Sequence, residues 1–376
     1  MKKKILTKLL IVCLFFGCIF VPNLNIQQVY ADVQTSAKAM CVIETTSKRV
    51  LYSKNLDQKL ANASTTKIAT FLTVLKNCED FDREIIVDDR AIGIEGTSIY
   101  LKPKERLTIK QLLFGMMLPS GNDAATALAL AISPSIEDFA KLMTNEAKSV
   151  GALNTNFKNP HGLDEEGHYT TAYDLALITA ECYKYEVFKE VVTTKNIKIP
   201  NITGYRYLKN KNKLLNTLEG CVGVKTGFTN DAGRCLVSSA IRDNMQVVCV
   251  VLNCGPMFEE SYGLIESAFN TFQMTDIIAP YTYLRSIPVI NSMQKQAKLY
   301  IQKGFSYPLT IEEKANIDIE AHIPSQVNAP IEKEESVGEL KIYLNKNLLF
   351  SEKIYTMEEI KSNKVEDNLK RFISNW

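Results

Sequence analysis

The hydrophobic pattern of residues 40–275 changes its period twice, and this constrains the fold more than any other feature of the chain. Met40–Tyr52 reads MCVIETTSKRVLY, two apolar arms around a polar centre, which predicts a β-hairpin. Leu236–Ala240 and Gln246–Leu252 are also apolar and flank a polar turn, so they predict two more strands. Predicted strands at both ends, with predicted helices between them, indicate a sheet covered by a helical insertion.

Between these strands, the apolar residues recur with the period of amphipathic helices. After Ser64, apolar residues recur at i, i+3, i+4 and i+7, namely at Ile68, Phe71, Leu72 and Leu75. A second helical pattern runs from Leu107 to Leu118, is interrupted by Pro119-Ser120-Gly121-Asn122, and resumes at Asp123. A closing helix is marked by apolar residues at Ile265, Ala268, Phe269 and Phe272.

The first 31 residues differ in composition from the rest. Four lysines precede the apolar run Leu9–Val21, and Val29-Tyr30-Ala31 offers small residues at a cleavage position, so we predict a secretory signal peptide. An uncleaved membrane anchor is the alternative, although the run is short for a span of ~20 residues. The chain has 44 basic and 42 acidic residues, and this balance argues against a nucleic-acid partner.

Seven of the nine cysteines follow the leader, so they cannot all pair with one another. Most lie in apolar text, where a thiol acts as a small buried hydrophobe. No C-x-x-C pair occurs, and His161, His168 and His322 are not spaced as a metal cluster. We expect no metal and no cofactor.

The pattern changes again near residue 278. Short alternating segments at Lys298–Ile301, Ile317–Ile319 and Leu340–Leu344 predict a small β-rich module. Met357–Trp376 mixes apolar residues with lysine and arginine, as in an interfacial helix. The pattern leaves two alternatives open: a peripheral membrane anchor, or a helix docked on its own protein.

Ser64 and Lys67 lie one helical turn apart at the start of a predicted helix. Residues i and i+3 share a face, so the Lys67 amine can reach the Ser64 hydroxyl. Burial and a neighbouring cation lower the pKa of a lysine, which can then act as a base. Ser292 and Lys295 have the same spacing, but they lie in the β-rich region.

Two further motifs follow in order. Ser120-Gly121-Asn122 occupies the interhelical break, whereas Ser53-Lys54-Asn55, with the same S-x-N pattern, continues a strand. Lys225-Thr226-Gly227 occurs once and follows strand text, which places Lys225 and Gly227 on one face and Thr226 on the other. An exposed edge of such a strand can accept an extended peptide.

The three motifs and their surroundings resemble the serine D-alanyl-D-alanine carboxypeptidases, the low-molecular-mass penicillin-binding proteins. The resemblance covers most of residues 39–275 and rests on the segments ASTTKIATFLTVLK, LLFGMMLPSGNDAATALA, NPHGLDEEGHYTTAYDLA, NKLL and GVKTGFTNDAGRCLVSSA. It implies an α+β fold like that of β-lactamases and penicillin-binding proteins: an antiparallel sheet flanked by helices with a helical subdomain, then a small β-rich C-terminal domain.

On this basis we divide the chain into a signal peptide (1–31), a catalytic domain (32–277), a β-rich domain (278–356) and an amphipathic tail helix (357–376). We expect an exported bacterial protein at the outer face of the membrane or in the wall. The implied partners are peptidoglycan stem peptides as substrate and β-lactams as inhibitors.

The resemblance also implies the roles of site residues. Ser64 would be the nucleophile, Lys67 its base and Ser120 a proton relay; Asn122 would hold the substrate amide. Lys225 and Thr226 would bind the terminal carboxylate, Gly227 would allow close approach, and the N–H groups of Ser64 and Phe228 would form the oxyanion hole. We expect His161 and His168 to order their loop and Asp123 to cap a helix.

Several alternatives stay open. A class A β-lactamase shares the motifs but needs a glutamate in an E-x-x-L-N pattern, and Glu165-Glu166 is followed by Gly167-His168-Tyr169-Thr170 instead. A DD-endopeptidase acting on cross-links fits the same motifs. A non-catalytic wall-binding protein would be expected to lack Ser64 or Lys67.

Overall fold

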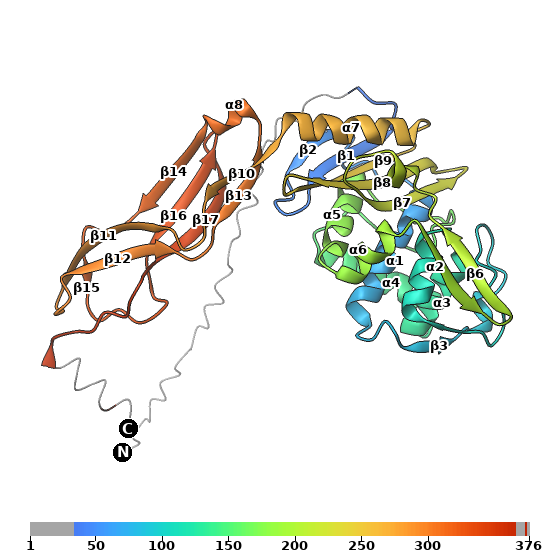
Figure 1. Cartoon of the computed structure of the whole chain (residues 1–376), viewed down its shortest axis with the longest axis horizontal. Coiled ribbons are helices and arrows are strands. Elements are labelled where there is room, and N and C mark those ends of the chain that lie inside the picture. Colours follow the sequence, from blue (N-terminus) through green and yellow to red (C-terminus); the bar gives the residue numbers. More distant parts are fainter. Residues whose placement is uncertain (1–33, 366–372, 374–376) are drawn as a thin grey trace, which may run out of the picture.

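The computed structural model describes residues 34–365 and residue 373 of the 376-residue chain. The described chain forms two units that lie side by side (Figure 1). The predicted signal peptide, with Cys13 and Cys18, lies outside the described residues. Among the helices of residues 34–365, none is long and apolar enough to cross a membrane.

A five-stranded antiparallel sheet forms the frame of the first unit, in the order β2-β1-β9-β8-β7. Its strands are β1 (Ala39–Glu44), β2 (Val50–Lys54), β7 (Cys221–Thr229), β8 (Gly233–Arg242) and β9 (Met245–Leu252). The predicted strands at both ends of this region are therefore confirmed. β7 lies at the edge of the sheet, where one side of its backbone is free of strand partners in this part of the chain.

Both faces of the sheet are covered, which explains why its central strands are apolar on both sides. In β1, Ala39, Cys41 and Ile43 belong to the helical core, whereas Met40 and Val42 pack in a second cluster beneath α7 (Met257–Thr271). Alternation of side chains along a strand produces this division.

The helical insertion packs on the other face of the sheet. It contains a 3-10 turn, η1 (Ala63–Thr66), and six helices. These are α1 (Lys67–Asn77), α2 (Ile109–Met117), α3 (Asn122–Ile132), α4 (Ile136–Ser149), α5 (Ala172–Cys182) and α6 (Glu186–Thr193). Short elements connect them: β3 (Glu84–Ile86), η2 (Asp89–Ala91), β4 (Arg106–Thr108), the hairpin of β5 (Asn196–Asn201) and β6 (Gly204–Lys209), and η3 (Lys213–Asn216).

Local signals set the helix boundaries next to the predicted motifs. α2 begins after Thr108, which forms a capping box with Gln111, so the helical pattern predicted from Leu107 starts two residues later. α1 is preceded by η1, and Ser64 lies in this 3-10 turn rather than in the α-helix itself.

The second unit is the predicted β-rich module. Its six-stranded sheet has the order β14-β16-β17-β12-β11-β15, beside the separate pair β10-β13 and the short helix α8 (Ile311–Lys314). The strands are β10 (Gln273–Ile278), β11 (Tyr283–Ile290), β12 (Gln296–Ile301), β13 (Phe305–Leu309), β14 (Ile317–His322), β15 (Val327–Asn328), β16 (Ser336–Leu344) and β17 (Asn347–Thr356).

Two boundaries of the β unit differ from the sequence-based expectation. β10 pairs with β13, so the strands of this unit begin at Gln273, before the expected boundary at residue 278. The tail helix expected from Met357 does not start there: residues 357–364 are not helical, and Ile360 forms a bridge with Ile331. Most of the remaining tail lies outside the described residues.

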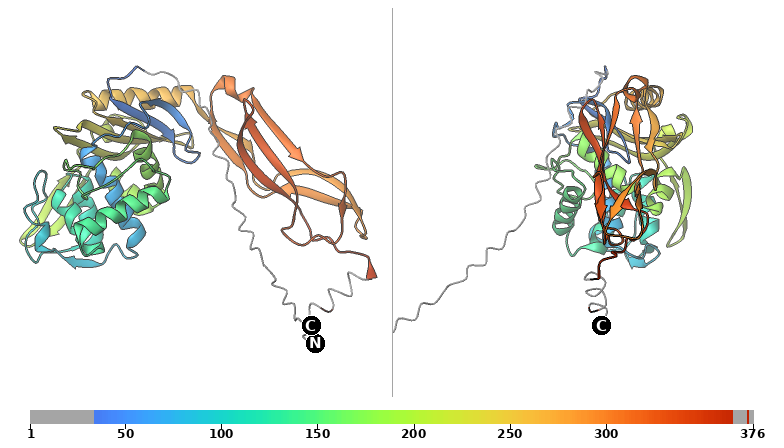
Figure 2. Two further views of the ribbon diagram at one scale, coloured as in Figure 1. Left: turned by 180° about the vertical axis from the view of Figure 1, so that it is seen from behind. Right: turned by 90° about the vertical axis from the view of Figure 1, so that its left-hand side faces the viewer.

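The junction between the units contains a buried arginine. Arg49, just before β2, donates to the carboxylate of Glu313 and to the carbonyl of Pro308. Its guanidinium lies 5.0 Å from the ring centre of Phe272 and 5.1 Å from that of Tyr307. The chain segment 357–365, dark red, lies at the end of the β unit remote from this junction (Figure 2).

Candidate active site

Ser64 and Lys67 are brought together as the spacing predicts. The turn η1 carries Ser64, and Lys67 is the first residue of α1. Lys67 Nζ lies 3.0 Å from Ser64 Oγ. The first turn of a helix has N–H groups without intrahelical acceptors, so the backbone around Ser64 presents donors to an incoming carbonyl oxygen.

Lys67 is fully buried and is fixed by three contacts. Besides Ser64 Oγ, its Nζ donates to Asn122 Oδ1 at 2.6 Å and to the carbonyl of His161 at 2.8 Å. Burial lowers the pKa of Lys67 well below its usual value, and the positive charges of Lys225 and Lys211 lower it further. A lysine in these surroundings is suited to accept a proton.

The break between α2 and α3 holds Ser120 and Asn122. Ser120 has φ of 75° and is 4% exposed, and within the described part of the chain its Oγ has no hydrogen-bond partner. Such strained residues with unpaired polar atoms are typical of functional sites. Asn122 also donates from Nδ2 to the carbonyl of Glu95 at 2.6 Å, so both ends of its amide contact the protein.

Strand β7 supplies the third motif. Lys225 is 1% exposed and donates to the carbonyl of Thr226 at 2.7 Å. Burial and the nearby charge of Lys211 lower its pKa to about 7. At Gly227 a β-carbon would lie 3.1 Å from the backbone of Asn62, Ser64 and Thr65, so only glycine fits here without displacement. The strand therefore passes directly beside the Ser64 turn.

A cleft of about 350 Å³ joins the three motifs. Five of the eight predicted residues line it, while Lys67, Asn122 and Lys225 lie buried behind its wall. The five are Ser64, Ser120, Thr226, Gly227 and Phe228. Phe228 is 61% exposed at the rim.

The sequence did not identify four further residues that line the cleft. They are Thr97, Lys211, Met257 and Phe258. Lys211 directly precedes the NKLL segment, which could have pointed to it. Met257 and Phe258 begin α7, far from β7 in the sequence, and no local pattern connects them with the site.

The histidines order their loop, as predicted. His168 Nε2 lies 2.9 Å from Thr66 Oγ1, and its Nδ1 accepts from the N–H of Lys158. Burial lowers the pKa of His168 to about 4 and that of His161, which also feels the charge of Lys67, to about 3. Both are therefore neutral near pH 7.

Asp123 does not cap α3, so that expectation is wrong. The helix cap is Gly121, and Asp123 lies inside the first turn with 1% exposure. Its carboxylate accepts from the N–H groups of Ile99 and Leu101 and from the Ser98 hydroxyl. It therefore anchors the loop that contributes Thr97 to the cleft.

Glu165 and Glu166 line a different cavity, of about 280 Å³, to which residues 61–63, just before Ser64, also contribute. Asn159 Nδ2 donates to Glu165 at 3.0 Å. All seven cysteines of the described chain are free, and burial raises the pKa of Cys235 to about 11. No group of three His, Cys, Asp or Glu side chains in that part of the chain could hold a metal ion.

Known proteins share both units. Residues 25–255 match the family described as D-alanyl-D-alanine carboxypeptidase, and residues 272–362 match the C-terminal domain of penicillin-binding protein 5. The carboxypeptidase DacF of Bacillus subtilis is 32% identical, over 92% of this chain and 91% of its own. The carboxypeptidase DacA of Escherichia coli is 28% identical, over 96% of this chain and 94% of its own.

Solved structures agree with this assignment. The carboxypeptidase DacD of Francisella tularensis superimposes with a TM-score of 0.68 at 25% identity, covering 93% of this chain and 100% of its own. Penicillin-binding protein 5 of Haemophilus influenzae is 24% identical and shares the fold, with a TM-score of 0.73. The match covers 88% of this chain and 99% of its own. The chain thus belongs to the D-alanyl-D-alanine carboxypeptidase family of serine-type hydrolases.

Proposed function

We propose that this protein removes the terminal D-alanine from peptidoglycan stem pentapeptides through an acyl-enzyme on Ser64. The observation that carries the proposal is the 3.0 Å contact between Lys67 Nζ and Ser64 Oγ at the wall of a cleft that Ser120 and β7 also line. A nucleophile within hydrogen-bond reach of a base, itself held by a third group, is the arrangement that covalent catalysis requires.

In the acylation step, the neutral amine of Lys67 takes the proton of the Ser64 hydroxyl. Oγ then attacks the carbonyl carbon of the penultimate D-alanine, and the oxyanion forms beside the N–H groups of Ser64 and Phe228. An oxyanion-hole donor of this kind is typically worth about 3–4 kcal/mol. The C–N bond breaks, and the leaving D-alanine amine receives the proton from Lys67 through Ser120.

Deacylation reverses these roles. A water molecule gives its proton to the base and attacks the ester carbonyl, which releases the shortened peptide and restores the Ser64 hydroxyl. Asn122 holds Lys67 and the loop at Glu95, so we assign it positioning of the base as well as contact with the substrate amide. Lys225 and Thr226 bind the terminal carboxylate.

A β-lactam would acylate the same serine. Attack on the lactam carbonyl opens the ring, but the leaving nitrogen stays attached to the acyl group and cannot diffuse away. Glu165 and Glu166 line another cavity than Ser64 does, which favours slow release of the antibiotic over β-lactamase turnover.

The test is release of free D-alanine from a soluble pentapeptide ending in two D-alanines. We expect one equivalent of D-alanine per peptide, with less cleavage of a cross-linked dimer. Cleavage of the dimer alone would identify an endopeptidase, and rapid hydrolysis of penicillin would identify a β-lactamase.

We also propose that the protein acts outside the cytoplasm, after cleavage of the leader following Ala31. Amino-terminal sequencing of the protein from its native cell tests this location. A chain that begins at Met1 in the cytoplasmic fraction would contradict it.

A further inference from the structure

The hairpin of β5 and β6 has two faces of opposite character. One face, with Ile199 and Leu208, is buried in the helical unit. The opposite face is exposed along its whole length and consists of Asn196, Lys198, Pro200, Tyr205, Tyr207 and Lys209. We call these six residues the outer face of the hairpin.

The outer face presents two flat aromatic rings to solvent. Tyr205 is 58% exposed and Tyr207 is 80% exposed. Lys198 is directly opposite Tyr207 in the strand register, and its Nζ lies 3.7 Å from the ring centre of Tyr205 and 5.8 Å from that of Tyr207. Cation–π contacts of this kind hold the rings in place. Large exposed aromatic side chains grouped on one surface mark a binding site.

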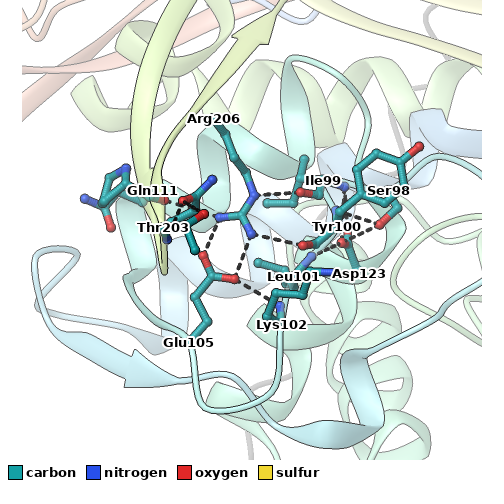
Figure 3. A network of polar contacts seen from close by, with 12 residues as sticks. Ser98, Ile99, Tyr100, Leu101, Lys102, Glu105, Gln111, Asp123, Thr203 and Arg206 are labelled. Carbon is teal, nitrogen blue, oxygen red and sulfur yellow. Dashed lines mark hydrogen bonds and ion pairs between the residues drawn. The ribbon is translucent and has the colours of Figure 1, made fainter.

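A buried ion pair fixes this hairpin to the loop of residues 98–105, which precedes β4 (Figure 3). Arg206, between the two tyrosines, points inward and forms a two-bond ion pair with Glu105. Its guanidinium also donates to the carbonyls of Ile99 and Tyr100, at 2.6 and 3.0 Å. Asp123 accepts hydrogen bonds from the N–H groups of Ile99 and Leu101 in the same loop, and Thr97, just before this loop, lines the cleft. The hairpin and the cleft therefore share one rigid support.

The distance from the cleft to the outer face matches the length of the substrate. Lys211 lines the cleft, and Tyr207 precedes it by four residues, so the two backbones are at most ~14 Å apart. An extended pentapeptide spans about 17 Å. When the end of a stem peptide lies at Ser64, its attachment point to the glycan chain is within reach of the hairpin.

We propose that the outer face of the hairpin binds the glycan strand that carries the stem peptide. The C–H faces of sugar rings stack on the exposed rings of Tyr205 and Tyr207, while Lys198 and Lys209 donate to sugar hydroxyl and amide oxygens. Two six-residue strands form a strip about 20 Å long, enough for several sugar units. This inference rests on the proposed function, because it concerns the polymer to which the peptide is attached.

The test compares two substrates that share the reacting peptide. One is the free pentapeptide ending in two D-alanines, and the other is uncross-linked glycan strands carrying the same pentapeptide. In the full chain, Tyr205→Ser with Tyr207→Ser should lower kcat/KM on glycan strands roughly tenfold, since two aromatic contacts of roughly threefold each are lost. Activity on the free peptide and labelling by a fluorescent penicillin should stay unchanged.

Two control variants make the result specific. Tyr205→Phe with Tyr207→Phe keeps the rings and should retain activity on glycan strands. Tyr281→Ser with Tyr283→Ser removes two comparably exposed rings, 71% and 52%, from the β unit and should have no effect on either substrate. Wild-type protein should sediment with glycan strands stripped of their peptides, and the double serine variant should not.

Equal activity of the serine variant and the wild type on glycan strands would overturn the inference. So would loss of binding to phospholipid vesicles or to a protein partner with unchanged binding to stripped glycan strands. Failure of the proposed function is separate, because the wild-type protein would then release no D-alanine from the free peptide.

Discussion

The two units of this molecule bury different kinds of side chain. In the first unit, which holds the candidate active site, Lys67 and Lys225 are among the largest fully buried side chains, and the carboxylate of Asp123 is buried as well. The main core of the β unit is aliphatic, with Leu299, Ile342 and Ile354 at its centre. Burying an ionisable side chain is costly unless other groups compensate for it. These buried ionisable side chains are concentrated in the first unit. Such groups cluster where a protein carries out chemistry, at a cost in stability.

Among the changes we predict, removal of the nucleophile should have the largest effect on activity and should leave the fold of both units unchanged. Ser64→Ala deletes the reacting oxygen and no core contact, so activity should fall by about 10⁶-fold while both units stay folded. Covalent labelling by a fluorescent penicillin, with thermal unfolding as the control, measures this. Undiminished labelling would place the nucleophile elsewhere.

The buried lysine of β7 should give the catalytic unit a distinctive pH dependence. Lys225 has a pKa of about 7, so its positive charge, which we assign to carboxylate binding, is lost as the pH rises above that value. The ratio of kcat/KM for the pentapeptide over its terminal methyl ester should fall about tenfold per pH unit well above 7, because kcat/KM follows the free enzyme. Lys225→Ala should abolish this pH dependence of the ratio.

The lowered pKa of Lys225 also predicts how the free energy of unfolding changes with pH. Between about pH 7 and its usual value of 10.5, Lys225 is neutral when folded and protonated when unfolded. Unfolding then takes up a proton, so stability rises with pH across this window. Flat stability from pH 7 to 10, in the wild type and in Lys225→Ala alike, would contradict the burial of a neutral lysine.

Close packing of β7 against the Ser64 turn can be tested with one methyl group. Gly227→Ala places a β-carbon 3.1 Å from three backbone atoms, so the turn must shift by a few tenths of an ångström. A shift of this size should lower the acylation rate by about tenfold. Gly263→Ala in α7, where nothing lies within 4 Å, is the matched control and should have no effect on acylation.

Much of this arrangement could be predicted, because short-range patterns determined it. The strands β1, β8 and β9 follow from apolar runs next to polar turns, and the contact between Ser64 and Lys67 follows from helical spacing. The sequence did not give the hairpin of β5 and β6, since half of each strand is polar or aromatic and exposed.

Long-range pairing explains the two boundaries of the β unit that differ from the sequence-based expectation. The β unit begins at Gln273 because β10 pairs with β13 about thirty residues later. Residues 357–364 are not helical, and Ile360 forms a bridge with Ile331 instead. An amphipathic pattern alone cannot reveal such a partner.

The junction of the two units should contribute to stability without affecting chemistry. Arg49→Ala removes a cation held by Glu313, Pro308 and two aromatic rings, and leaves the Glu313 carboxylate without its arginine. We expect a loss of about 2 kcal/mol in the free energy of unfolding, measured in urea, with unchanged activity on the free pentapeptide. Arg90→Ala, which breaks the surface pair with Asp88, is the control. Equal effects of both variants would contradict a structural role for Arg49.

The smallest effect on the folded protein should come from truncation of the tail, which we propose as a peripheral membrane contact. The cut must follow Val365, because Ile360 is 1% exposed and belongs to the core of the β unit. Deletion of residues 366–376 should leave activity and unfolding unchanged and move the protein from the membrane fraction into the medium. Deletion from Met357 should also destabilise the β unit. If the shorter deletion leaves the protein on the membrane, its attachment depends on another part of the chain.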